Sequence, residues 1–364
     1  MSTCPEAIIE QLAAERPDSG PVGWAERGWL PDGLIRLGIR RLCAQRLRQE
    51  STGGPQAQMQ RLTARLADLA GSPIAVHTGA ANAQHYELPA EFFAACLGPR
   101  MKYSCAYYPH GNEDLASAEE AMLTLVGERA ALADGQRILE LGCGWGSLTL
   151  WMAERYPNAR ILGISNSQAQ RAYIEGQCRR RGLGNVEIRT QDVCQLQLEA
   201  AQFDRCVSVE MFEHMRNYDA LLGNIARWLR PGGRLFVHIF AHRQFMYPFD
   251  AGRDDWMGRL FFTGGLMPAV DTLLHFQRDL RIEQRWLLDG RHYQRTANHW
   301  LANQDAHRAQ VLRALGEIYG SGHAELWAQR WRMFWMACAE LFGFDGGRAW
   351  LVAHYRFVRP GGHS

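Results

Sequence analysis

One repeated pattern limits the folds open to this chain more than any other feature. From residue 136 onward, short apolar runs alternate with turns and with helical patterns. Strands that alternate with helices form parallel βαβ units. The sequence therefore predicts an α/β fold built on a doubly wound, Rossmann-like sheet. The apolar runs that we expect to be its strands lie at 137–141, 159–164, 185–190, 203–209 and 234–240.

The segments on either side of this repeat predict an extension and an insertion. Residues 1–100 alternate helical patterns with breakers, so we expect a helical N-terminal region before a main domain at 101–364. An aromatic and glycine-rich stretch at about 242–280 interrupts the repeat and predicts a lid. The elements expected beyond the lid are strands at 282–288 and 350–358 and two long helices across 292–342.

Composition excludes several classes of function. The 364 residues carry a formal net charge of +2, which argues against nucleic-acid binding by bulk charge. No apolar run approaches the roughly 20 residues of a membrane span, and no secretory signal is apparent, so we expect a cytoplasmic protein. Nine cysteines without a CxxC pair favour reduced thiols over disulfides or zinc. An arginine-rich helical stretch at 34–48 fits either an anionic membrane surface or a solvated helix face.

Two carboxylates and an imidazole follow the fourth apolar run directly. Glu210, Glu213 and His214 come after residues 206–209, which are expected to form a buried parallel strand. In open α/β sheets, ligands bind at the carboxyl ends of the strands. These three side chains are therefore candidates for the chemistry.

The glycine turn at 142–146 distinguishes between nucleotide-type cofactors. A dinucleotide fingerprint needs a further glycine at position 147, where the chain has Ser147, which we expect to cap the next helix. The turn at 165–168 also lacks the acidic residue that binds the ribose of NAD. S-adenosylmethionine instead needs glycines, ribose-binding groups and an acid near adenine. The matching residues, in that order, are Gly142 and Gly144, Asn166 and Gln170, and Asp192 with Val193. The set predicts a class I methyltransferase.

Four motifs make the resemblance more specific. The chain resembles the cyclopropane-fatty-acid synthase superfamily of S-adenosylmethionine enzymes over about residues 100–358. Within that superfamily, residues 209–218 and 337–344 resemble the coclaurine N-methyltransferase branch, which methylates benzylisoquinoline-type amines. One position departs from the family, because Thr263 replaces the usual proline of the lid. The four motifs are Met101-Lys102-Tyr103-Ser104-Cys105-Ala106-Tyr107-Tyr108, the turn at 140–146, Met211-Phe212-Glu213-His214 and Tyr293-Gln294-Arg295-Thr296.

The resemblance implies roles for individual residues. Tyr103 and Ser104 would contact the amino-acid end of the cofactor. Glu210, Glu213 and His214 would face the amine of a small aromatic or isoquinoline-type substrate. The aromatic residues expected to line the substrate pocket are Trp331, Phe334 and Trp335.

The lipid branch of the superfamily is the alternative. It transfers a methylene group to an unsaturated acyl chain with the help of bicarbonate, and the resemblance places that anion at Cys105, Glu213, His238 and Tyr293. Glu210 favours the amine branch, because lipid enzymes generally carry glycine there and an unpaired charge is costly in an apolar tunnel. A third possibility, a cofactor-binding protein without catalysis, is disfavoured by the acid–base residues.

The chemistry expected for an amine acceptor is an in-line methyl transfer. A protonated amine has no lone pair, so carboxylates would attract the ammonium and a base would take its proton. His214, with an ordinary pKa of about 6.5, has a suitable side chain, and Glu213 would orient it. We expect no metal and, as partners, a small-molecule substrate and a possible second copy of the chain.

Overall fold

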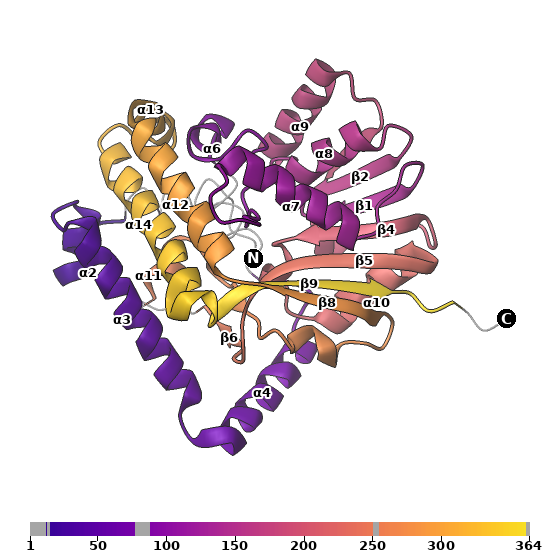
Figure 1. Cartoon of the computed structure of the whole chain (residues 1–364), viewed down its shortest axis with the longest axis horizontal. Helices are drawn as coiled ribbons and strands as arrows, with labels where there is room; N and C mark the ends of the chain where they lie inside the picture. The colour runs from indigo at the N-terminus through magenta and orange to yellow at the C-terminus, as the bar shows by residue number, and fades with distance from the viewer. Residues whose placement is uncertain (1–11, 13–14, 77–87, 250–254, 362–364) are drawn as a thin grey trace.

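A seven-stranded mixed sheet forms the centre of the computed structural model, which describes residues 12, 15–76, 88–249 and 255–361 (Figure 1). The strand order is β3-β2-β1-β4-β5-β9-β8, and the first five strands are parallel. β9 lies antiparallel between β5 and β8. The bounds are β1 (Arg137–Leu141), β2 (Arg160–Ser165), β3 (Val186–Thr190), β4 (Phe203–Val209), β5 (Leu229–His242), β8 (Arg281–Leu288) and β9 (Trp350–Val358).

All seven predicted strands are confirmed, and one begins earlier than expected. β5 starts at Leu229, whereas the expected apolar run begins at residue 234, so the segment 230–233 lies within the strand. The register between β4 and β5 shifts between Phe203 and Arg205, opposite this segment. Gly232 has φ +74° there, which a glycine adopts without a steric penalty. The strand therefore absorbs the Pro-Gly-Gly run as a local irregularity.

The helices between the strands follow the predicted alternation. They are α8 (Ser147–Arg155), α9 (Gln168–Arg181) and α10 (Tyr218–Trp228). Ser147 does not cap α8, because the capping position is held by Gly146 with φ +79°. α9 has a side-chain cap, in which Ser167 Oγ accepts the backbone N–H of Gln170.

Three C-terminal helices replace the two that were expected across 292–342. They are α12 (Arg291–Ala306), α13 (Arg308–Tyr319) and α14 (Ala324–Gly343). His307 separates the first two with non-helical backbone angles, and Gly320, with φ +84°, ends α13. α12 packs against α14 and β9, so these helices close over one end of the sheet (Figure 1).

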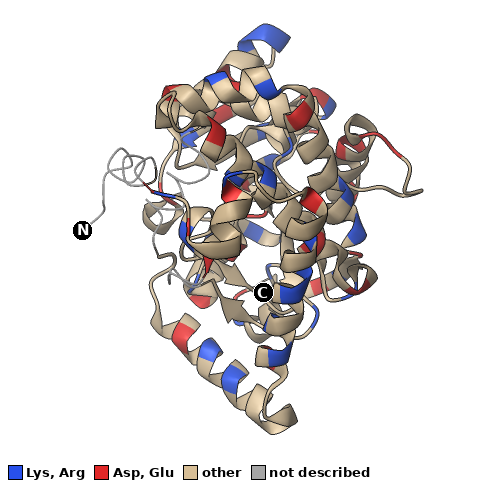
Figure 2. Cartoon of the chain, turned by 90° about the vertical axis from the view of Figure 1, so that its left-hand side faces the viewer, with Lys and Arg blue, Asp and Glu red and all other residues tan. Residues whose placement is uncertain are grey.

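The helical N-terminal region lies against the C-terminal helices. Its described helices are α2 (Gly20–Glu26), α3 (Asp32–Ser51), α4 (Gly54–Gly71) and α6 (Ala90–Cys96), followed by α7 (Leu115–Arg129). Arg36 and Arg40 of α3 form ion pairs with Glu340 of α14 at 2.8 and 2.6 Å. Part of the arginine-rich face is thus used within the protein, and Figure 2 shows basic and acidic residues interspersed along the helices in view. The division at residue 100 stays a prediction.

Within the described ranges, no helix combines the length and the apolar character that crossing a bilayer requires.

The insertion between β5 and β8 is irregular, as expected for the lid. It contains β6 (Tyr247–Pro248), α11 (Trp256–Leu260) and β7 (Leu266–Met267), and β6 pairs with β7. Residues 250–254 of the predicted lid lie outside the described residues. Thr263, at the position of the usual proline, donates its hydroxyl to the carbonyl of Gly258 at 2.7 Å, which closes the end of α11.

Hydrophobic residues pack on both faces of the sheet. Along β1, Ile138 joins one buried cluster with α7, α8 and the C-terminal helices, whereas Leu139 and Leu141 join another with α10. A strand sends successive side chains to opposite faces, so a strand covered on both faces must be apolar throughout. This burial leaves the carboxyl ends of the parallel strands as the edge where polar side chains gather.

Candidate active site

A cavity lined in part by polar side chains, which we call the polar cavity, lies at the carboxyl ends of β1, β2, β3 and β4. The sequence-predicted cofactor residues all line it: Tyr103, Ser104, Gly142, Gly144, Asn166, Gln170, Asp192 and Val193. Each comes from the segment that follows a strand or from the loop before α7. The structure therefore brings together one set of residues that the sequence spreads over 90 positions, as parallel topology requires.

The polar cavity has features that fit S-adenosylmethionine. Gly144 has φ +51°, and a Cβ added there would meet no protein atom within 4 Å, so it would project into space that a ligand can use. Gln170 Nε2 is buried and has no hydrogen-bond partner among the described residues, which leaves a donor for a ribose hydroxyl. Asp192 Oδ1 accepts the N–H of Cys194 at 2.8 Å, so this carboxylate is held at the cavity wall.

Burial shifts the pKa values of two ionisable side chains near the polar cavity in opposite directions. Glu140 lines the polar cavity and accepts the hydroxyl of Thr149, and burial raises the pKa of Glu140 to about 8. It is therefore a neutral acid at pH 7. Burial lowers the pKa of Lys102, whose Nζ donates to the Cys105 carbonyl at 2.8 Å, and the charge of Glu210 opposes that fall.

An aromatic cavity adjoins the polar one. It is lined from the ends of β4 and β5, the lid, α12 and α14, and most of its walls are apolar rings and thioethers. Its lining residues are Tyr103, Glu210, His214, Phe240, Phe249, Met257, Phe262, Met267, Tyr293, Trp300, Phe334, Cys338, Leu341 and Phe342. Among the residues that the structure describes, Tyr103, Glu210 and His214 alone line both cavities. These three residues mark the place where a group can pass from one cavity to the other.

Glu210 is the most densely bonded side chain at this junction. Its Oε1 accepts the backbone N–H of Cys105 at 2.9 Å and lies 3.1 Å from His238 Nε2, and its Oε2 accepts the hydroxyl of Tyr293 at 2.7 Å. Burial raises the pKa of Glu210, while Lys102 and these hydrogen bonds restrain the rise. The carboxylate is thus fixed in place by groups from three separate elements.

Glu210 is also held in a conformation unusual for a residue with a side chain. Its φ is +47°, in the left-handed region that favours glycine. Backbone strain of this kind costs on the order of 1–3 kcal/mol and persists where the surroundings enforce it. The hydrogen bond from its N–H to the carbonyl of His238, at 2.8 Å, belongs to that enforcement.

Glu213 lies behind this junction. Its side chain is fully buried and lines neither cavity, its Oε1 accepts the N–H of Phe240 at 2.8 Å, and its Oε2 has no hydrogen-bond partner among the described residues. Burial, and after it the charge of Glu210, raises the pKa of Glu213 well above its usual value. The structure thus places Glu213 in the wall behind the cavities, and its direct contact with the acceptor stays a prediction.

His214 faces both cavities as a neutral imidazole. Burial lowers the pKa of His214 to about 4, Arg216 adds to this fall, and Glu210 opposes it. The fold thus shifts the pKa of His214 below the ordinary value of about 6.5. His214 offers a lone pair throughout the neutral range, but it is a weaker base than a free histidine.

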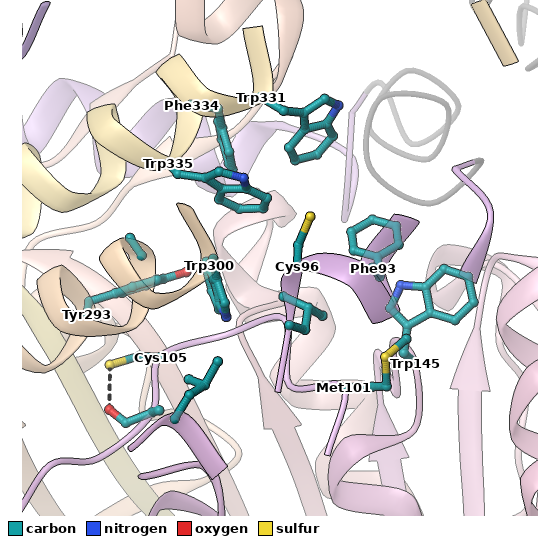
Figure 3. Close-up of a cluster of buried hydrophobic side chains, with 14 of the residues drawn as sticks. Phe93, Cys96, Met101, Cys105, Trp145, Tyr293, Trp300, Trp331, Phe334 and Trp335 are labelled. Atoms are coloured by element: carbon teal, nitrogen blue, oxygen red, sulfur yellow. Dashed lines mark hydrogen bonds between the residues drawn. The ribbon is translucent and has the colours of Figure 1, made fainter. Parts of the chain in front are cut away.

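The three predicted substrate aromatics separate into two groups. Phe334 lines the aromatic cavity, but Trp331 and Trp335 do not. Both tryptophans are fully buried, and Trp335 Nε1 donates to Gln304 Oε1 at 2.6 Å. Figure 3 shows the three rings clustered on α14 above Trp300 and Tyr293 of α12. The tryptophans thus support the wall, and only Phe334 is placed to contact an acceptor.

Sequence reasoning missed most of the aromatic cavity. Phe249, Met257, Phe262 and Met267 come from the lid, which was predicted as a segment without assigned contacts. Phe240 was not singled out either, and Phe342 stood within the motif at 337–344 without an assigned contact. For the lid residues, the signal was the aromatic content of that segment.

Comparison with known proteins places the chain in a family. The family model described as mycolic acid cyclopropane synthetase matches residues 76–347. The chain belongs to this family. A curated relative, (S)-coclaurine N-methyltransferase of Thalictrum flavum subsp. glaucum, is 34% identical over 339 residues, covering 92% of this chain and 94% of the relative. Another, cyclopropane-fatty-acyl-phospholipid synthase of Escherichia coli (strain K12), is 31% identical over 280 residues, covering 76% of this chain and 68% of the relative.

Solved structures of the family agree with this placement. The crystal structure of coclaurine N-methyltransferase bound to N-methylheliamine and SAH has a TM-score of 0.88 at 34% identity and covers 96% of this chain and 99% of its own. Mycolic acid cyclopropane synthase CmaA1, complexed with SAH and CTAB, shares the fold with a TM-score of 0.63 at 21% identity. The match covers 81% of this chain and 98% of that structure. The protein is therefore an S-adenosylmethionine-dependent methyltransferase of the class I fold, as the sequence predicted, and the reading as a cofactor-binding protein without catalysis falls away.

Proposed function

We propose that this methyltransferase transfers a methyl group to the nitrogen of a small aromatic or isoquinoline-type amine. The observation that carries the proposal is the position of Glu210. Its carboxylate accepts hydrogen bonds from Cys105 N–H, His238 Nε2 and the Tyr293 hydroxyl. These are three of the four residues that the lipid alternative assigns to bicarbonate. A side-chain carboxylate already lies where that free anion would bind.

The fourth residue of the alternative site also weakens the lipid reading. Glu213 lies outside both cavities, and its Oε1 accepts the Phe240 N–H. A bicarbonate ion would have to share the donors with Glu210 and would be repelled by its charge. Glu210, by contrast, is a carboxyl group held in place at the junction, and an ammonium group is the natural counterpart of its ionised form.

The walls of the aromatic cavity fit a flat, cationic acceptor. Ring faces attract a nearby cation by roughly 0.5–2 kcal/mol, more when water is excluded. The ring centroids of Phe262 and His214 are 4.7 Å apart, and those of the stacked rings of Tyr293 and Phe342 are 4.2 Å apart. Aromatic rings therefore lie close to the junction. The relatives named (S)-coclaurine N-methyltransferase and pavine N-methyltransferase support an amine acceptor.

The residues at the junction divide the chemistry between them. The polar cavity would hold S-adenosylmethionine, which supplies an electrophilic methyl group when bound. Glu210 attracts the ammonium, and Tyr103 and the cavity rings orient it. The nitrogen can attack only after losing a proton, and neutral His214 lines both cavities and can accept it. Because the pKa of His214 is about 4, transfer from an ammonium is uphill, so turnover should rise with pH.

A labelling experiment tests the proposal against its alternative. The protein is incubated with methyl-labelled S-adenosylmethionine and either a panel of isoquinoline and phenethyl amines or vesicles of unsaturated phospholipid, with and without bicarbonate. We expect label in an amine and no dependence on bicarbonate. Label in phospholipid that rises with bicarbonate, with no amine turnover, would replace the proposal with methylene transfer. Cys105→Ala serves as a matched variant, because it keeps the N–H that binds Glu210 and should leave amine turnover intact.

A further inference from the structure

We infer that His354 and Arg129 are positioning residues that fix the tautomer of His238 and thereby keep Glu210 a hydrogen-bond acceptor. The inference rests on the proposed function in one respect, namely that the Glu210 carboxylate binds the acceptor's ammonium. Four side chains form the chain of contacts, which we call the histidine relay. It runs from Arg129 through His354 and His238 to Glu210.

The distances of the histidine relay are all those of hydrogen bonds. Arg129 Nη1 lies 2.9 Å from His354 Nδ1, and His354 Nε2 lies 2.9 Å from His238 Nδ1. His238 Nε2 lies 3.1 Å from Glu210 Oε1. Both histidines are fully buried, so water cannot replace any of these partners.

The direction of every bond follows from one residue. A guanidinium has only donors, so Nδ1 of His354 must accept. His354 then carries its single proton on Nε2 and donates to Nδ1 of His238. His238 in turn carries its proton on Nε2 and donates to Glu210. Arg129 therefore sets the tautomers of both histidines, and every N–H of the relay is aimed toward Glu210.

Electrostatics support neutral histidines at both positions. Burial lowers the pKa of His238 well below its usual value, and Lys102 and Arg129 lower it further. The pKa of His354 is also well below its usual value, because of burial and then of His238, Arg129 and Lys102. If either histidine were protonated, its Nδ1 would carry a hydrogen and would face another donor, Arg129 Nη1 for His354 or His354 Nε2 for His238. Neither contact could then be a hydrogen bond.

The sheet topology is the reason that these residues meet. His238 on β5 and His354 on β9 are directly paired, and His354 is also paired with Trp286 on β8. Residues directly opposite each other on neighbouring strands point to the same face of a sheet. The insertion of β9 between β5 and β8 thus extends a row of side chains from the site toward the edge of the sheet.

Arg129 is held at the outer end of this row by an aromatic ring. Its guanidinium carbon lies 5.0 Å from the centre of the Trp286 ring, and that of Arg356 lies 5.6 Å from it. Arg356 donates to the Arg129 carbonyl at 3.1 Å and pairs with Glu283, whereas it is Arg129 that lies at hydrogen-bond distance from His354. Arg356 is therefore a matched control for charge and ring contact.

The fixed direction also constrains the path of the substrate proton. To leave along the relay, a proton on Glu210 would need an accepting lone pair on His238 Nε2, and that nitrogen already carries hydrogen. The relay therefore serves to orient the carboxylate and not to conduct protons. The proton of the ammonium must leave on the opposite side of the junction, where His214 lies.

Histidine ¹⁵N spectra combined with kinetics test the inference. The full-length protein is labelled at its 13 histidines, and the signals of His238 and His354 are assigned by replacing each with glutamine. We expect both residues to show the Nε2–H tautomer. In Arg129→Met, the Nδ1–H form of His354 should appear, and KM for an amine substrate should rise roughly threefold to tenfold with little change in kcat, as for loss of one weak hydrogen bond.

Two further variants guard against a purely structural effect. Arg356→Met should change neither the spectra nor KM. His354→Gln should keep most of the amine affinity, because its amide can accept from Arg129 and donate to His238, whereas His354→Leu should lose it. A Nδ1–H tautomer at His238 or His354 in the unmodified protein would overturn the inference. So would an Arg129→Met variant with the same spectra and the same KM as Arg356→Met. The spectra need no turnover, so absence of amine methylation would count against the proposed function alone.

Discussion

The polar cavity and the aromatic cavity meet at three residues but are assembled in different ways. The polar cavity takes most of its lining from the loop 101–104 and from the ends of β1, β2, β3 and β4 with the segments that follow them, and Val76 and two residues of α7 complete it. The aromatic cavity draws on the lid, α12 and α14, which are distant in sequence and join only through tertiary packing. Changes in one cavity should therefore affect one ligand and leave the affinity for the other unchanged, except at the shared junction.

The largest expected effect comes from closing the polar cavity. Gly144→Val should raise the Kd for S-adenosylmethionine by at least about 100-fold, because its Cβ and methyl groups would occupy ligand space. Gly182→Val is the matched control: Gly182 also has positive φ and open surroundings, but it ends α9 away from the cavity. Calorimetry that finds equal affinity in the two variants would remove the cofactor from this cavity.

The next effect should appear at the shared junction. His214→Ala should lower kcat for an amine on the order of 100-fold near pH 7, the usual range for loss of a proton acceptor. The loss should shrink as pH rises, because free amine then needs no base. His242→Gln serves as the control, since His242 is buried with a similarly low pKa but lines neither cavity. A deficit for His214→Ala that stays constant with pH would assign the residue a role in packing or orientation only.

The dependence of stability on pH should differ in sign between Glu140, which lines the polar cavity, and His242, which lines neither cavity. Burial lowers the pKa of His242 to about 4, so the folded protein binds fewer protons there than the unfolded chain between pH 6.5 and 4. Stability from this residue is present above pH 6.5 and is lost as pH falls, by about 2 kcal/mol at pH 5. Glu140, with its pKa raised to about 8, acts oppositely and costs stability as pH rises from 4.5 to 8.

Denaturant titrations between pH 5 and 8 measure both slopes. His242→Gln should flatten the loss of stability on the acid side, and Glu140→Gln should flatten the loss on the alkaline side. Unchanged slopes in both variants would mean that these groups titrate alike in the folded and unfolded states.

The smallest effect is expected in the wall of the aromatic cavity. Phe334→Leu should raise KM for an aromatic amine roughly threefold to fivefold, through loss of a ring face, and leave the cofactor Kd unchanged. Phe357→Leu, a fully buried phenylalanine on β9 that lines neither cavity, is the control. If Phe334→Leu shifted only the cofactor Kd, the two cavities would not be independent.

The difference in assembly also explains what the sequence could predict. The strands were predicted because each parallel strand is a short apolar run between turns, and the cofactor residues because each follows such a strand. Ser147 was wrong as a cap because the turn ends in a left-handed glycine, Gly146, which occupies that position. The break at His307 was missed because the helical pattern continues on both sides of it.

The histidine relay and the aromatic wall depend on contacts without a local signal. His354 lies beside His238 only because β9 enters the sheet antiparallel to β5, 116 positions further along the chain. Trp331, Phe334 and Trp335 share one face of a helical pattern, and no periodicity says which of them reaches a cavity. Likewise, the pKa of His214 follows from burial by residues of the lid and C-terminal helices.

The central claim is that the Glu210 carboxylate occupies the set of donors formed by Cys105 N–H, His238 and Tyr293 and binds the amine from there. Glu210→Gly removes the carboxylate and relieves the positive φ, leaving an empty anion site. The decisive measurement is kcat/KM of this variant on an amine as a function of added formate. We predict a loss of about 100-fold or more without formate, as for truncation of a buried charge partner, and saturable recovery with formate that disappears in Glu210→Gly combined with His238→Gln. Amine turnover by Glu210→Gly at the rate of the unmodified protein, with no response to formate, would contradict the claim.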